Sequence, residues 1–186
     1  PVYKECEYMV KCGLTPMEAI ECATKNCADY LLKITPHDNG PMDGVPPTYK
    51  LEVCEASGHD YGEVVRNRRN TIMMLYPSYV GKAYLLLEEK IKEPKYLDAA
   101  IKIGEFYLRN VQQNGTWNII IDGRTGETIS RNPCDPLTNI VPFLMQLYER
   151  TGDEKWKTLS DNAITFVEKN TLLTYNWEGQ FEDSGL

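Results

Sequence analysis

The sequence is poor in the residues that build metal, redox and phosphate sites. It has only two histidines, His37 and His59, and none of its six cysteines belongs to a Cys-x-x-Cys motif. Zinc ribbons, thioredoxin-like redox sites and His-Glu-x-x-His zinc sites depend on those residues and spacings. An acidic calcium loop and a glycine-rich phosphate loop are missing as well. We therefore expect no metal and no cofactor.

Long apolar runs and an excess of positive charge are also absent. No run of eighteen apolar residues occurs, so we expect no transmembrane helix. The chain has 20 Lys and Arg against 27 Asp and Glu, a net charge of −7. This balance argues against nucleic acid and against an anionic membrane as partners. The hydrophobic share of 42% is ordinary for a globular chain.

The compartment is left open by the sequence. An even number of cysteines permits disulfides without showing them. Asn114-Gly115-Thr116 matches the glycosylation motif, which is weak evidence by itself. A secreted or periplasmic location is slightly favoured over a cytoplasmic one.

The strongest positive signal is internal repetition. Residues of the same kind recur 60 positions apart, since 155 − 95 = 60, and a fixed period indicates a repeated supersecondary unit. An earlier copy, residues 28–33, aligns with residues 104–109 at a larger shift. The pairs at the 60-residue shift are Lys95-Tyr96 with Lys155-Trp156, Glu89 with Glu149, Phe106 with Phe166, and Trp117 with Trp177.

Two kinds of helix alternate along the chain. Amphipathic segments carry apolar residues three and four positions apart, whereas 71–88 and 137–149 are apolar nearly all round. A helix without a polar face is buried on all sides, so the apolar helices should form an inner layer and be the most buried. Asp122-Gly123 between β-prone runs predicts a β-hairpin at 117–130. The predicted helices are 16–34, 70–90, 96–112, 136–150 and 155–169.

These features predict an all-α fold: a helical-hairpin array with a small β-hairpin in one loop. The two-layer alternation, the helix ending Phe106-Tyr107-Leu108-Arg109-Asn110 and the segment 146–156 resemble the six-hairpin (α/α)-toroid superfamily of carbohydrate-active enzymes. The resemblance covers residues 16–183. It implies that 1–186 is a single domain of about two and a half hairpins, a partial (α/α) toroid that belongs to a larger one. An uncovered apolar flank would then call for a homodimer or for the remainder of a longer chain.

The resemblance implies a carbohydrate substrate but does not choose the reaction. The superfamily includes glycoside hydrolases, polysaccharide lyases and sugar epimerases, and a fold alone does not separate them. We expect an enzyme domain that hydrolyses the glycosidic bonds of a poly- or oligosaccharide. The alternatives are a polysaccharide lyase or uronic-acid epimerase, and a non-catalytic helical repeat that binds a partner.

Candidate site residues lie in three long loops that should emerge on one face, 39–49, 117–127 and 175–183. Glycosidic hydrolysis commonly uses two carboxylates, and sugars stack on aromatic rings. We expect Glu178 or Glu182 to approach Asp43 within about ten ångströms. Asp122 is a further candidate acid of the second loop, but Asp before Gly is commonly a simple turn residue. Trp117 and Trp177 could pack in the core instead of binding a sugar. The predicted catalytic residues are Glu178, Glu182 and Asp43, and the predicted substrate-binding residues are Trp177, Trp117, Tyr49 and Asp183.

Overall fold

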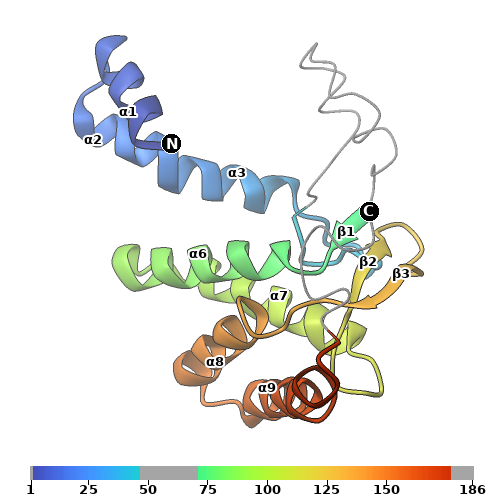
Figure 1. Ribbon diagram of the computed structural model, residues 1–186. Helices are drawn as coiled ribbons and strands as arrows, with labels where there is room; N and C mark the ends of the chain where they lie inside the picture. The colour runs from blue at the N-terminus through green and yellow to red at the C-terminus, as the bar shows by residue number, and fades with distance from the viewer. Residues whose placement is uncertain (1, 47–70, 177–186) are drawn as a thin grey trace. The chain divides into compact units, whose positions relative to one another are not determined.

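The structure is a computed structural model that describes residues 2–46 and 71–176 (Figure 1). The chain divides into two compact units, Pro1–Thr35 and Pro36–Leu186. The single domain proposed for 1–186 stays a prediction. None of the described helices has an apolar stretch long enough to cross a membrane.

The first unit is a small helical hairpin. Thr15 starts its second helix with a capping box: the Thr15 hydroxyl accepts from Glu18 N, and the Glu18 carboxylate accepts from Thr15 N at 2.8 Å. The helix predicted at 16–34 is confirmed, with one π-helical turn in its middle. The first helix was not predicted. The elements are α1 (Val2–Lys11), α2 (Pro16–Glu21), η1 (Cys22–Asn26) and α3 (Cys27–Ile34).

The second unit contains two helical hairpins. Within it, α6 contacts α7 and α8, and α8 contacts α9. Each hairpin turns at a residue in the left-handed conformation, Lys92 at φ 62° and Gly152 at φ 69°. The short gaps between the predicted helices 70–90 and 96–112, and between 136–150 and 155–169, are therefore confirmed as short turns. The helices are α6 (Tyr76–Ile91), α7 (Pro94–Asn110), α8 (Ile140–Thr151) and α9 (Glu154–Phe166), and η2 (Val167–Thr171) and α10 (Leu172–Thr174) continue α9.

The all-α prediction is wrong, because the second unit also holds a three-stranded antiparallel sheet (Figure 1). The sheet consists of β1 (Thr71–Met73), β2 (Asn118–Asp122) and β3 (Thr128–Pro133), with β2 in the centre. The predicted hairpin is β2–β3. β1 occupies the start of the helix predicted at 70–90. Three residues are too few to show a period, and β1 forms because its backbone pairs with the free edge of β2.

The predicted contrast between inner and outer helices is also wrong. α6 should be buried on all sides, but Tyr79 is 49% exposed and Leu86 is 57% exposed. α7 was predicted as an outer helix, yet Ile103 and Phe106 are fully buried. Both helices thus bury one face, as helices in a layered α/β unit do. These findings overturn the two-layer helical array on which the partial (α/α) toroid was based.

Tyr107 joins the helices to the sheet in the core. Its ring packs edge-on against Trp117, with centroids 5.4 Å apart, and also contacts Phe143. Its hydroxyl donates to Met74 O at 2.6 Å and accepts from Ser78 N at 2.9 Å. Burial raises the pKa of Tyr107 well above its ordinary value, so the hydroxyl stays neutral and keeps both bonds. These contacts tie α7 to the junction between β1 and α6.

Candidate functional site

A hollow of about 670 Å³ lies between the connection that follows α7 and the β2–β3 hairpin. It is large enough for a small ligand, since ligand sites commonly span about 300 to 1,000 Å³. Its lining side chains are all polar, and most of them are exposed. They are Gln112, Asn114, Asn118, Glu127, Thr128 and Arg131.

Backbone turns and strand pairing hold these side chains in place. Asn118 on β2 donates from Nδ2 to the Thr128 hydroxyl on β3 at 2.9 Å, which fixes one wall. The opposite wall is a tight turn in which Gln112 N donates to Thr116 O at 2.8 Å. Asn114 closes that turn, because its Oδ1 accepts from Thr116 N at 3.1 Å. The lining is therefore built by local structure on both sides.

Gly115 allows the turn to lie close to α9. Its φ is +89°, a region that favours glycine. A Cβ at this position would lie 2.9 Å from Asn162 O, so a side chain would push the turn away from the helix. The wall of the hollow thus depends on a residue without a side chain.

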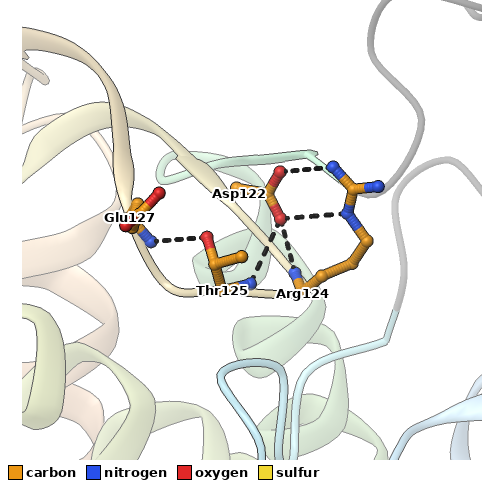
Figure 2. Close-up of polar contacts among 4 residues, drawn as sticks. All are labelled: Asp122, Arg124, Thr125 and Glu127. Carbon is orange, nitrogen blue, oxygen red and sulfur yellow. Dashed lines mark hydrogen bonds and ion pairs between the residues drawn. The ribbon is translucent and has the colours of Figure 1, made fainter.

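The carboxylate of Asp122 is held within the β2–β3 turn (Figure 2). It accepts hydrogen bonds from Arg124 N at 2.7 Å and Thr125 N at 3.2 Å, and forms an ion pair with the Arg124 guanidinium at 2.8 Å. The hydrogen bonds from the Arg124 side chain lower the pKa of Asp122 to about 2. An acid that is ionised and engaged in this way is a turn residue, the alternative that the sequence had left open.

Glu127 differs from Asp122 although both close the same turn. Its backbone N donates to the Thr125 hydroxyl at 3.2 Å, and its backbone O accepts from Asp122 N at 2.8 Å (Figure 2). Its carboxylate makes no hydrogen bond or ion pair within residues 2–46 and 71–176. Glu127 lines the hollow together with Arg131. The pair presents an acceptor and a donor to a ligand.

Asp43 is the one predicted catalytic acid within the described residues. It lies in the segment 36–46, where its backbone O accepts from Arg109 Nη2 at 3.0 Å. The same segment reaches the hairpin turn, since a Cβ on Gly126 would lie 3.5 Å from Pro41 Cβ. The first and second loops therefore touch, but Asp43 is not among the residues that line the hollow.

Trp117 occupies a position that does not suit a substrate-binding ring. Its side chain is 0% exposed, and its indole N–H donates to Tyr107 O at 2.8 Å. A sugar would need a free ring face, so the position supports the alternative of core packing. The other predicted residues lie outside the described residues: Glu178, Glu182, Trp177, Tyr49 and Asp183.

Sequence reasoning missed most residues of the hollow because it searched for acids and rings. Glu127 stood at the edge of the predicted second loop, but the only acid considered from that loop was Asp122. Arg131 belongs to β3, beyond the hairpin bounds that the sequence predicted. Side chains of a strand point alternately to the two faces of a sheet. Had the strand been predicted to include residue 131, this alternation would have placed the Arg131 side chain on one face, and that is the one signal that could have identified it.

No group of three or more metal-binding side chains occurs in the part of the chain that the structure describes. No protein-family model, curated protein or solved structure matches this sequence. The hollow is therefore interpreted from its own geometry and chemistry.

Proposed function

We propose that this chain binds a poly- or oligosaccharide in the hollow beside β3 and acts on its glycosidic bonds by hydrolysis. The observation that carries the proposal is the lining of amide, hydroxyl, carboxylate and guanidinium groups around a volume of about 670 Å³. Sugar hydroxyls both donate and accept hydrogen bonds, and these side chains offer both kinds of partner.

A second hollow supports a ligand longer than one sugar. It has a volume of about 580 Å³ and runs along the end of α7 and the face of α9. Gln112 and Asn114 line both hollows, so the turn that carries them lies between two adjoining sites. Neighbouring sites that share a wall suit successive units of an oligosaccharide.

Hydrolysis also needs a second acid. Glycosidases commonly use two carboxylates on opposite sides of the bond. In this proposal Glu127 supplies one, and Glu178 or Glu182 supplies the other. Glu127 is the candidate within the described residues because it lines the hollow and its carboxylate makes no hydrogen bond or ion pair there.

Arg131 favours an acidic sugar and keeps a second reaction open. A guanidinium can bind a carboxylate through two parallel hydrogen bonds, which a neutral sugar cannot reproduce. A uronic acid bound in this way is the substrate of polysaccharide lyases and epimerases. Glycosidic elimination at a uronic acid is therefore the alternative reaction.

The test compares Glu127→Gln and Arg131→Met with Glu149→Gln, which removes an exposed carboxylate of α8 outside the hollow. Neutral and uronic-acid oligosaccharides are titrated by calorimetry into each protein. We expect Arg131→Met to weaken uronate binding about tenfold or more, as loss of a charged hydrogen bond does. Glu149→Gln should bind like the parent. Equal affinities in all four proteins would refute the site.

Product analysis separates the reactions. Both reactions release a new reducing end, but only elimination also leaves an unsaturated sugar that absorbs ultraviolet light. We expect new reducing ends without ultraviolet absorbance from the parent, and no new reducing ends from Glu127→Gln. Unsaturated products would favour the lyase, and binding without any product would favour the non-catalytic binding module.

A further inference from the structure

The first unit has very little buried surface to hold its helices together. Ala19 and Ala28 are its only buried hydrophobic residues within 2–35, whereas Tyr3, Tyr8 and Met17 are more than half exposed. A helical unit of this size usually needs a disulfide, a metal or a partner. A disulfide between cysteines of different helices would meet this need.

Cys6 and Cys22 lie at the contact between α1 and the helix formed by α2 and η1. Both are partly shielded from solvent, whereas Cys12 and Cys27 are exposed. Cys6 Sγ lies 3.8 Å from the backbone O of Ala19. Cys22 N donates to the same oxygen. The thiol of Cys6 on α1 thus lies at the carbonyl group that also accepts from the backbone of Cys22.

The side chain of Cys22 is oriented by its neighbour one turn later. Asn26 Nδ2 donates to Cys22 Sγ at 3.5 Å, so the sulfur is held in a defined position. Cys27, the nearest competitor, points its thiol at the backbone instead, since its Sγ contacts Cys22 O at 3.2 Å. The thiol of Cys27 is therefore engaged with a carbonyl and is not directed at another sulfur.

We propose that Cys6 and Cys22 form a disulfide that links α1 to the helix of α2 and η1. In the reaction, the Cys22 or Cys6 thiolate attacks a small-molecule disulfide and releases one thiol. The other cysteine then attacks the mixed disulfide, forms the S–S bond and releases a second thiol. Two protein thiols are oxidised and the small disulfide is reduced to two thiols, which take up the two protons that the cysteines lose.

The link would stabilise the hairpin because it crosses between helices. The two cysteines are separated by 16 positions (22 − 6 = 16), and closing a loop of this length restricts the unfolded chain substantially. A link between Cys22 and Cys27 would lie within a single continuous helical segment and would not join α1 to it.

The test uses the full chain, first reduced and then incubated with oxidised glutathione under native conditions. Free thiols are alkylated, and the protein is digested with trypsin without reduction. Cleavage after Lys4, Lys11 and Lys25 places Cys6 in one peptide, Cys12 and Cys22 in a second, and Cys27 in a third. We expect mass spectrometry to find the first and second peptides linked.

Variants assign the link and control for folding. Cys12→Ser and Cys27→Ser should each retain the linked peptides, whereas Cys6→Ser and Cys22→Ser should each lose them. Circular dichroism checks that each reduced variant keeps its helices. Oxidation should also raise the temperature at which the parent loses helix, and not that of Cys6→Ser. Loss of the link in Cys12→Ser, a main product that joins Cys22 to Cys27, or glutathione adducts alone would overturn the proposal.

Discussion

The two helical hairpins of the second unit use the same contacts in different surroundings. Lys95 lies over the ring of Tyr96 at 4.9 Å, and Lys155 lies over the ring of Trp156 at 4.4 Å, 60 positions later. Asn110 donates to Phe106 O at 2.8 Å, and Asn170 donates to Phe166 O at 2.9 Å. Phe106 is fully buried, whereas Phe166 is only half-buried. The repeat therefore reproduces local chemistry, and burial distinguishes the two copies.

This difference in burial indicates that α7 lies at the centre of the second unit and α9 at its periphery. α7 packs against α6 and α8, and it carries Tyr107, which bonds the β1–α6 junction. α9 contacts α8 and lines one of the hollows with its exposed side. Equivalent substitutions in the two copies should therefore have unequal effects.

The largest difference is expected from the repeated phenylalanines. Phe106→Ala should lower the free energy of unfolding by about 3–5 kcal/mol, because a buried ring leaves a cavity. Phe166→Ala should lower it by only about 1–2 kcal/mol, since its ring is already partly in water. Urea unfolding of both variants measures the difference. Equal losses would mean that burial does not separate the copies.

The second largest loss of stability is expected at two glycines where the hairpins contact each other. A Cβ on Gly81 would lie 2.3 Å from Phe143 Cε2, and one on Gly104 would lie 2.6 Å from Leu147 Cδ1. Gly81→Ala should destabilise by about 1–3 kcal/mol, because an aromatic ring cannot fold away from the added methyl group. Gly104→Ala should cost less, because its nearest contact is a leucine methyl group that can rotate and the Trp156 ring lies farther away, at 2.9 Å. Thermal unfolding of both variants checks this order, and the reverse order would contradict it.

The two short turns should respond with opposite signs. Lys92 and Gly152 both adopt positive φ, but only glycine does so without strain. Lys92→Gly should therefore stabilise by about 1 kcal/mol, and Gly152→Ala should destabilise by about the same amount. Chemical unfolding of each single variant, with the double variant as a control for additivity, measures both. Two changes of the same sign would show that the turns are not equivalent.

The smallest effect concerns the first turn of α9. Asp153 caps α9 by accepting from Lys155 N at 3.1 Å, whereas Glu93 makes no such cap at α7. The hydrogen bond from the Lys155 side chain lowers the pKa of Asp153 below its ordinary value. The Asp153 carboxylate therefore stabilises the folded state above about pH 4. This stabilisation is lost as the pH falls through the pKa that Asp153 has in the folded protein.

The measurement compares melting temperatures of the parent and Asp153→Ala between pH 7 and pH 2. At pH 7 we expect Asp153→Ala to melt at a slightly lower temperature than the parent. At pH 2 this difference should be smaller. Glu93→Ala serves as the matched variant without a cap. A constant difference across the range would show that the Asp153 carboxylate does not contribute through its charge.

Much of the helical structure could be predicted because its signals are local. Thr15 and Glu18 identify a helix start within four residues, and the helices predicted at 96–112 and 136–150 are confirmed as α7 and α8 within a few residues. α1 was not predicted, and its large apolar side chains Tyr3, Tyr8 and Val10 are exposed. The π-helical turn of η1 leaves no trace in the apolar period that predicted 16–34.

The candidate site was much harder to predict. Asp122 and Glu127 look alike in sequence, and only the turn shows that one carboxylate is bound and the other open. Trp117 looked as suitable for a ligand as for the core, and its hydrogen bond to Tyr107 O decided for the core. Side-chain type indicates what a residue can bind, but not whether it is accessible.

The sequence by itself determined the helices, their short turns and the repeat of Lys, aromatic and Asn contacts, because capping and the 3.6-residue period act over a few positions. Only the tertiary structure decided the strand β1, the burial of Trp117 and the hollow around Glu127 and Arg131. Each of these depends on segments far apart in the chain. Strand pairing and burial are set by which surfaces meet, and a local pattern of residues does not contain that information.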